Sequence, residues 1–206
     1  MKFLKFVYPI LAATWLATPC WAQMQNLPIN SLPPPNIFGG LAIMEALNNR
    51  HSGKDFSYNT IDYQTLSEIL WAAWGINRDD GKRTVPTAMN QQNMQVYVLM
   101  ANGAWLYNAQ NNNIEQVTAQ DLRSYLQTQE YTQNAPVFLL YTTNGNPAGM
   151  TDAMQAGSMY QNVALYCAAK GLNNVVRADF QKSDLAAALG IDEDTILISQ
   201  VVGYPI

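Results

Sequence analysis

Two short polar segments contain the side chains best suited to bind a charged or hydrogen-bonding ligand. The first is Arg50-His51-Ser52-Gly53-Lys54. In an extended chain, alternate side chains point the same way, so Arg50, Ser52 and Lys54 would form one row. That row places two cations around a hydroxyl, an arrangement that suits a phosphate monoester. A solvated loop of the same composition is the alternative for this segment taken alone.

The second segment is Arg83-Thr84-Val85-Pro86-Thr87-Ala88-Met89-Asn90-Gln91-Gln92. Pro86 provides a rigid turn and Thr87 a hydroxyl. Asn90 and Gln92 carry amides that donate and accept hydrogen bonds at once. A planar heterocycle with alternating donors and acceptors needs such partners, although a plain polar turn would contain similar residues.

Other common chemistries find no support in the sequence. His51 is the only histidine, and no carboxylate cluster has metal-ligand spacing, so we predict no metal site. The sequence contains no G-x-S-x-G elbow, no P-loop and no G-x-G-x-x-G loop. Cys167 lies among Leu165, Ala168 and Ala169, a context that favours a small core residue over a nucleophile.

Together, the two segments resemble those of the FMN-dependent nitroreductase superfamily. In that family, R-H-S-x-K grips the FMN phosphate and ribityl chain, and P-[ST]-x-x-N-x-Q lines the flavin ring. The resemblance implies an intertwined homodimer with flavin at the subunit interface and two-electron transfer to a small-molecule substrate. It implies FMN contacts at Arg50, His51, Ser52, Lys54, Pro86, Thr87, Ala88, Asn90 and Gln92.

Three further strings resemble the branch that contains the peptide-azoline dehydrogenases: Leu70–Arg78, Tyr160-Gln161-Asn162 with Lys170-Gly171-Leu172, and Val202–Pro205. Departures from the family pattern leave a second function open. The chain ends at Ile206 without the family's basic tail, Asn173–Asp179 replaces glycines near flavin N5, and the Lys-Tyr pair of azoline dehydrogenases is absent. The alternative is a catalytically inactive binding or assembly protein of the cell envelope, without flavin.

Hydrophobic periodicity and turn residues predict the elements that must position the two segments. We expect Gly75 and Gly171 to end their helices as left-handed caps. The apolar run 136–142 should be a strand that is buried on both faces. The elements indicate one α+β domain, and the resemblance implies a nitroreductase-like fold over 41–206, with a central, mostly antiparallel sheet flanked by helices. The predicted helices are 41–49, 60–75, 118–129, 152–170 and 183–189, and the predicted strands are 95–100, 104–107, 136–142, 175–176 and 195–204.

The first forty residues differ in composition from the rest. Residues 1–22 join Lys2 and Lys5 to an apolar stretch and end in Cys20-Trp21-Ala22, the pattern of a cleaved signal peptide. An uncleaved anchor is the alternative. Residues 23–40 contain four prolines and two adjacent glycines and predict a Pro-rich arm without a packed element. The chain is therefore expected to be exported, to the periplasm or beyond, with no membrane span after cleavage.

Composition narrows the range of partners. The 206 residues carry a formal net charge of −4, and removal of residues 1–22 would make it −6. An acidic chain disfavours nucleic acid as a partner. Only 13% of residues are charged, against roughly 25% in typical domains, which suggests that a partner covers some of the surface and fits the homodimer that the resemblance implies.

Overall fold

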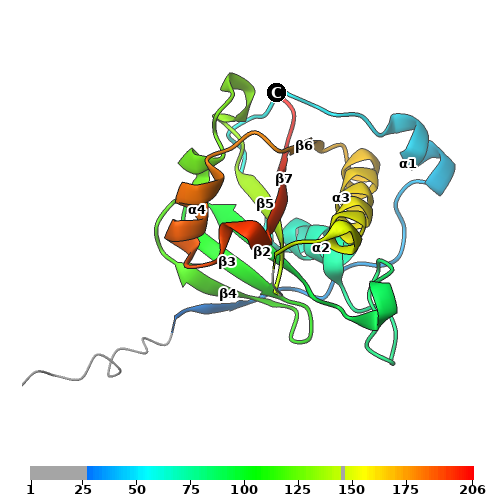
Figure 1. Ribbon diagram of the computed structural model, residues 1–206. Helices are drawn as coiled ribbons and strands as arrows, with labels where there is room; N and C mark the ends of the chain where they lie inside the picture. Colours follow the sequence, from blue (N-terminus) through cyan, green and yellow to red (C-terminus); the bar gives the residue numbers. More distant parts are fainter. Residues whose placement is uncertain (1–26, 145–146) are drawn as a thin grey trace, which may run out of the picture.

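A seven-stranded antiparallel sheet forms the centre of the molecule (Figure 1). The computed structural model describes residues 27–144 and 147–206. Strands lie in the order β1-β4-β3-β2-β5-β7-β6, and each neighbouring pair is antiparallel. The predicted α+β class and antiparallel sheet are confirmed. The strands are β1 (Ile29–Ser31), β2 (Met94–Met100), β3 (Gly103–Asn108), β4 (Asn113–Thr118), β5 (Val137–Thr143), β6 (Asn173–Arg177) and β7 (Ile196–Gly203).

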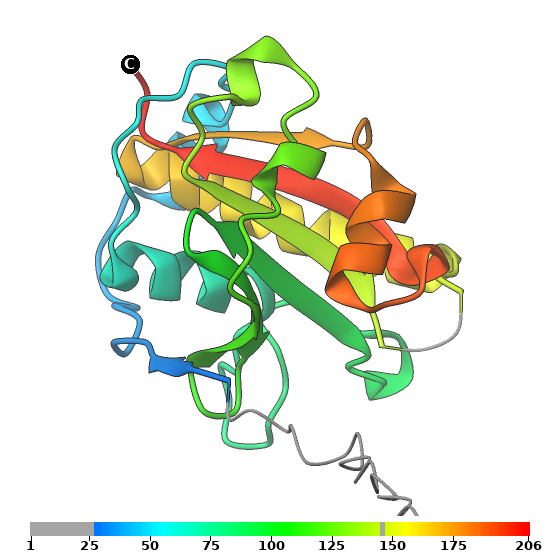
Figure 2. The ribbon, with the colours of Figure 1, turned by 90° about the vertical axis from the view of Figure 1, so that its left-hand side faces the viewer.

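Helices cover both faces of this sheet (Figure 2). Two of them pack on one face, α2 (Tyr63–Trp74) and α3 (Met150–Lys170), and α4 (Lys182–Leu189) packs on the other. The short helix α1 (Ile43–Asn49) lies against α3 and projects from the body of the molecule. Single 3₁₀ turns occur at Ala88–Asn90, Arg123–Tyr125, Glu130–Thr132 and Glu193–Thr195.

The hydrophobic core has two parts, one on each face of the sheet, because side chains alternate between the faces along the central strands. In β2, Val96 and Val98 belong to the core under α2 and α3, whereas Tyr97 and Leu99 belong to the core under α4. Successive strand residues point to opposite faces, so each core takes every second side chain. All seven residues of β5 are buried, which confirms the prediction of a strand covered on both faces.

The two predicted glycine caps differ in outcome. Gly171 ends α3 with φ 68°, the left-handed cap that was expected. Gly75 ends α2 with φ −67° and ψ 159°, so the prediction of a left-handed cap there is wrong. Glycine is needed at position 75 for space instead, because a Cβ would lie 2.3 Å from Cδ1 of Trp71.

The prediction of a helix over 118–129 is also wrong. Thr118 is the last residue of β4, a strand that starts at Asn113 and pairs with β3. Leu122 and Leu126 are both buried, and their spacing imitates a helix face although only one 3₁₀ turn lies between them. Pairing with the neighbouring strand has overridden the local pattern.

The Pro-rich arm is bound to the domain by hydrogen bonds along residues 28–36. Ile29–Ser31 forms β1 and pairs with β4, so the expectation of no packed element in 23–40 is wrong at these residues. Beyond β1, the Pro33 carbonyl accepts hydrogen bonds from Ser67 Oγ at 2.6 Å and from Asn112 Nδ2 at 2.9 Å. The predicted signal peptide, 1–22, lies outside the described residues. None of the helices within 27–144 and 147–206 combines the length and apolar character needed to cross a bilayer.

Candidate functional site

The first segment runs beside the sheet edge formed by β6. The Gly53 N–H donates to the Asn174 carbonyl at 3.0 Å, and Asn173 Nδ2 donates to the Asp55 carbonyl at 2.7 Å. A Cβ at position 53 would lie 2.1 Å from Asn173 Oδ1, so only glycine allows this approach. The backbone of the segment is therefore held in place while the side chains of Ser52 and Lys54 are exposed.

The charges of this segment are available to an anion. Within the described residues, no carboxylate forms an ion pair with Arg50 or Lys54. Lys54 Nζ lies 5.4 Å from the centre of the Tyr131 ring, a weak contact, and it donates no hydrogen bond to another of the described residues. His51 is exposed, with Nδ1 2.9 Å from the Asn49 carbonyl oxygen. Two cations beside the Ser52 hydroxyl are the donor set that a phosphate monoester needs.

The second segment contains a backbone strained at three residues. Met89, Asn90 and Gln92 have φ values of 48°, 56° and 48°, in the left-handed region that residues with a side chain rarely adopt. Each such residue costs on the order of 1–3 kcal/mol, and such conformations are concentrated at binding and catalytic sites. Met89 is also 88% exposed, so packing of its own side chain does not impose this shape.

Arg83 connects this strained loop to the end of α2. Its Nε donates to Gln92 Oε1 at 2.8 Å, and its Nη1 donates to the Trp74 carbonyl at 3.1 Å. The guanidinium also lies 4.8 Å from the centre of the Trp74 ring. Gln92 Nε2 then donates to Asn90 Oδ1 at 3.0 Å. Burial lowers the pKa of Arg83, although a guanidinium stays charged at any ordinary pH.

Within a single chain, the two segments lie at opposite ends of α3. Pro86, Thr87 and Ala88 line a cavity of about 250 Å³ with residues of the first turns of that helix. His51 lines another cavity, of about 340 Å³, with Cys167 and Gly171 at the other end. A helix of this length spans about 30 Å. A pocket shared by both segments, as the resemblance implies, would have to be completed by a second chain and stays a prediction.

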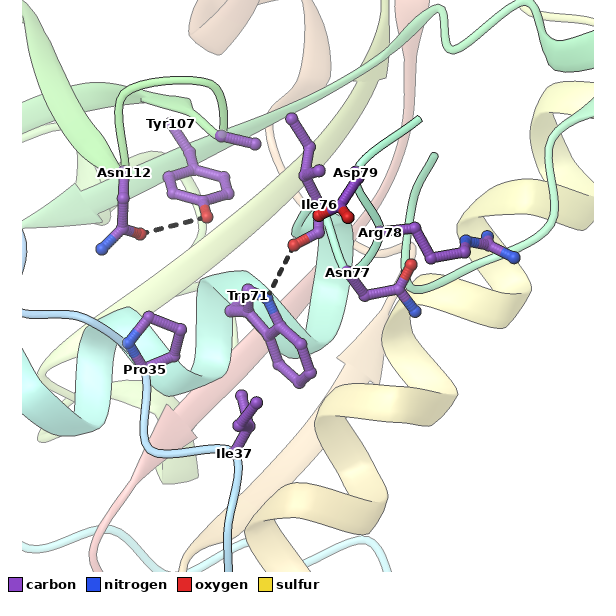
Figure 3. A pocket seen from close by; sticks show the side chains of 10 residues that line it. Pro35, Ile37, Trp71, Ile76, Asn77, Arg78, Asp79, Tyr107 and Asn112 are labelled. Atoms are coloured by element: carbon purple, nitrogen blue, oxygen red, sulfur yellow. Dashed lines mark hydrogen bonds between the residues drawn. The ribbon is translucent and has the colours of Figure 1, made fainter. Parts of the chain in front are cut away.

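Larger cavities lie elsewhere and contain none of the predicted site residues. One of about 440 Å³ lies under the Pro-rich arm, between Pro35 and Ile37 of the arm and Trp71 of α2 (Figure 3). Several of its polar side chains form hydrogen bonds within the chain. Tyr107 Oη donates to Asn112 Oδ1 at 3.3 Å, and Trp71 Nε1 donates to the Ile76 carbonyl at 3.1 Å. Another, of about 530 Å³, lies beside Tyr58 and the β2–β3 turn.

Cys167 is a core residue, as predicted. Its side chain is completely buried, and burial raises the pKa of its thiol far above neutrality. Such a thiol is not a nucleophile at physiological pH. No group of three or more His, Cys, Asp or Glu residues within 27–144 and 147–206 is arranged to hold a metal ion.

Most side chains of the segment that replaces the expected glycines near flavin N5 are turned into the protein. Asn173 and Asn174 are buried, and Gln200 Nε2 donates to Asn174 Oδ1 at 2.9 Å. The buried Arg177 guanidinium donates to the carbonyl oxygens of Leu126 and Asp179. Asp179 itself is exposed.

The sequence profile of the nitroreductase family matches residues 47–204, nearly the whole of the described domain. The chain therefore belongs to the nitroreductase family. A crystal structure described as a nitroreductase from Ralstonia eutropha JMP134 is 33% identical, with a TM-score of 0.80 over 86% of this chain and 90% of that chain.

Two further comparisons extend this result. A protein of Methanocaldococcus jannaschii named as a nitroreductase, MJ1384, is 24% identical over 179 residues, which cover 78% of this chain and 90% of that protein. A crystal structure from Desulfovibrio desulfuricans, described as a nitroreductase in complex with FMN, is 18% identical. It has a TM-score of 0.59 and covers 81% of this chain and 88% of that one. At that identity the likeness concerns the fold.

The residues present fit an FMN group. The first segment supplies two cations without ion-pair partners in the described chain and one hydroxyl, which match a phosphate. The second supplies a cavity wall and polar side chains on a strained backbone. Sequence reasoning identified both segments, but it gave Arg83, the first residue of the second segment, no role and passed over Gln155. The signal for Gln155 was present, since it falls on the buried face of α3 with Ala156, Met159 and Val163.

Proposed function

We propose that this protein is an FMN-dependent oxidoreductase that works as a homodimer. The observation that carries the proposal is the strained Thr87–Gln92 loop, in which Met89, Asn90 and Gln92 are left-handed next to the cavity lined by Pro86, Thr87 and Ala88. Family membership and the FMN-bound relative support the choice of cofactor. Bound FMN would supply two-electron transfer to a small-molecule substrate.

The chain's own residues would bind and orient the cofactor. Arg50 and Lys54 would neutralise the phosphate, and the Ser52 hydroxyl would donate to one of its oxygens. The Pro86–Gln92 loop would form a wall against the flavin ring, with Thr87, Ala88 and Asn90 as contacts. His51 and Gln92 complete the set of cofactor residues in this proposal. No side chain is assigned as an acid or base, because the protein's contribution here is position and electrostatics.

A two-fold axis would complete the site. Two chains related by an axis perpendicular to α3 would place the C-terminal end of one α3 beside the N-terminal end of the other. The first segment of one chain would then face the second segment of its partner. Apolar side chains exposed on α1 and α3, among them Ile43, Met44, Met150 and Met154, support burial of this side of the molecule.

Binding experiments with FMN and riboflavin distinguish recognition of the FMN phosphate from recognition of the flavin ring. The wild-type protein should show a flavin absorbance spectrum as purified or after addition of FMN. Arg50→Ala and Lys54→Ala should each weaken FMN binding by about tenfold, the scale of a charge-assisted hydrogen bond. The same variants should bind riboflavin, which lacks the phosphate, as the wild type does.

Lys82→Ala is the control, since Lys82 is exposed and paired with Asp80 outside both segments. Its FMN affinity should not change. A protein that stays colourless and takes up no added FMN would contradict the proposal and leave the alternative of an inactive binding protein of the envelope.

Within the family, we propose membership of the branch that contains the peptide-azoline dehydrogenases, on the strings at Leu70–Arg78 and Val202–Pro205. We also propose export to the periplasm or beyond, on the composition of residues 1–22. The mature protein should then be recovered from the exported fraction of its native host with Gln23 as its first residue. Recovery of Met1 in the cytosolic fraction would exclude export.

A further inference from the structure

Gln155, in the second turn of α3, holds a hydrogen-bond acceptor that the chain itself does not use. The residue is 3% exposed and lines the cavity of the Pro86 loop together with Thr87 and Ala88. Among the residues that the structure describes, its Oε1 is buried and has no hydrogen-bond partner. Buried polar atoms without a partner are rare and costly in native proteins. A donor from outside the chain would remove that cost.

A relay of hydrogen bonds determines which end of the Gln155 amide remains free. The Asp152 carboxylate accepts from the Gly149 N–H at 2.8 Å and from Asn93 Nδ2 at 2.7 Å. A carboxylate only accepts, so the Asn93 amide must turn its nitrogen to Asp152. Asn93 Nδ2 donates to Thr143 Oγ1 as well, at 3.0 Å.

The Asn93 oxygen therefore faces Gln155. Gln155 Nε2 lies 3.4 Å from Asn93 Oδ1 and 3.4 Å from the Thr151 carbonyl, both of them acceptors. Rotating the amide would bring oxygen against oxygen at both contacts, so the observed orientation is the favourable one. The free end is consequently an oxygen, and a ligand in the cavity that Gln155 lines could satisfy it with a hydrogen-bond donor.

We infer that Gln155 Oε1 accepts the hydrogen bond of flavin N3–H, an inference that rests on the proposed function. The oxidised flavin ring has a single N–H group, at N3, between two carbonyl groups. The cavity wall formed by the second segment carries the Thr87 hydroxyl, which can donate to one of those carbonyls. Gln155 thus adds a cofactor-binding residue that belongs to neither sequence segment.

A chemical double-mutant cycle tests the contact through binding and not through turnover. The fluorescence of FMN and of N3-methyl-FMN, which lacks the donor, is titrated with the intact wild-type protein and with Gln155→Ala. The wild type should bind FMN at least about tenfold more tightly than the methylated analogue. Gln155→Ala should weaken FMN binding several-fold and discriminate between the two flavins by no more than about twofold.

Thr142→Val provides a matched control. Thr142 Oγ1 in β5 is likewise buried without a partner among the described residues, but Thr142 does not line the Pro86 cavity. Its substitution should leave both flavin affinities unchanged.

The outcomes separate this inference from the proposed function. A wild type that binds FMN tightly but does not discriminate against N3-methyl-FMN overturns the role of Gln155 and leaves the flavin function in place. This comparison needs no variant, so it decides the matter even if Gln155→Ala fails to fold. A wild type that binds neither flavin overturns both.

Discussion

Gly53 and Asn173 show how closely the first segment is fitted to the sheet. The Asn173 side chain occupies the space that a Cβ at position 53 would need, and its amide nitrogen donates to the Asp55 carbonyl. A glycine in the middle of a charged, exposed segment would otherwise loosen the chain. At position 53, the missing side chain instead lets the backbone approach β6 closely enough for the Gly53 N–H to donate to the Asn174 carbonyl.

Replacing Gly53 by alanine should therefore be destabilising. Because a Cβ would clash with Asn173 at 2.1 Å, we expect Gly53→Ala to lower the free energy of unfolding, by about 1–3 kcal/mol as for other overpacked sites. Urea denaturation measures the change. Gly157→Ala in α3 is the comparison, since the nearest heavy atom there is 3.7 Å away. Equal stability of the two variants would show that the structure can accommodate a Cβ at position 53.

Glu68 is a buried carboxylate at the junction of α2, α3 and the arm. Its oxygens accept from Tyr166 Oη at 2.7 Å, Lys170 Nζ at 2.9 Å and Gln64 Nε2 at 2.9 Å. Burial by itself would raise its pKa. The hydrogen bonds from Tyr166, Lys170 and Gln64 outweigh burial and lower the pKa from 4.5 to about 2.

This shift predicts an acid-dependent stability. A lowered carboxyl pKa stabilises the fold above the unfolded pKa, and the contribution is lost as the pH falls from about 5 towards 2. It amounts to about 3 kcal/mol at most. Glu68→Gln should be less stable than the wild type at pH 6, with the difference shrinking at pH 4 and pH 3. Urea titrations at each pH give the comparison, and a constant difference would refute the assignment.

At the scale of elements, the long helix α3 and the strained Thr87–Gln92 loop determine the positions of the candidate cofactor-binding residues. The helix α3 sets the separation between the two segments, and its first turns form one wall of the Pro86 cavity. The loop depends on Arg83, which connects Gln92 to the end of α2. Removal of this connection should release the left-handed residues towards ordinary conformations.

We expect Arg83→Met to weaken FMN binding by about three- to tenfold and to lower stability by about 1–2 kcal/mol, the scale of the hydrogen bonds it removes. Flavin fluorescence and urea denaturation report the two effects separately. Lys82→Met, one residue earlier and exposed, is the matched control. A variant with weakened stability but unchanged FMN affinity would show that Arg83 supports the fold without positioning the loop.

At the scale of the whole molecule, apolar exposure is concentrated next to α1 and α3. Met44 in α1 is 72% exposed, and Phe38, in the segment that precedes α1, is 81% exposed. Exposed apolar groups of this size mark surfaces that bind a partner. In the proposed homodimer these residues would be covered, and the two halves of the cofactor site would meet.

Charge introduced on α1 should then separate the chains. Met44→Glu combined with Leu47→Glu should convert a dimer to a monomer in light scattering, because burying two carboxylates in an apolar contact is costly. FMN binding should fall with it. Tyr58→Glu is the control, since Tyr58 is 80% exposed but lies beside the β2–β3 turn. A double variant that remains dimeric and binds FMN normally would contradict the proposed interface.

The sequence by itself determined the elements whose patterns are local. The periodicity of α2, the apolar run of β5 and the glycine cap of α3 all follow from neighbouring residues. The two candidate binding segments were evident for the same reason, since their residue types and spacing are continuous along the chain.

Tertiary structure alone decided what depends on contacts between distant residues. β1 and β4 form because strands pair across the sheet, not because of their own composition. The free oxygen of Gln155 depends on Asn93 and Asp152, which meet only when β2 packs beside α3. Sequence patterns predict local structure because the residues involved are neighbours along the chain. Which amide atom of Gln155 lacks a partner, and how far apart the two segments lie, depend on contacts that form only in the folded chain.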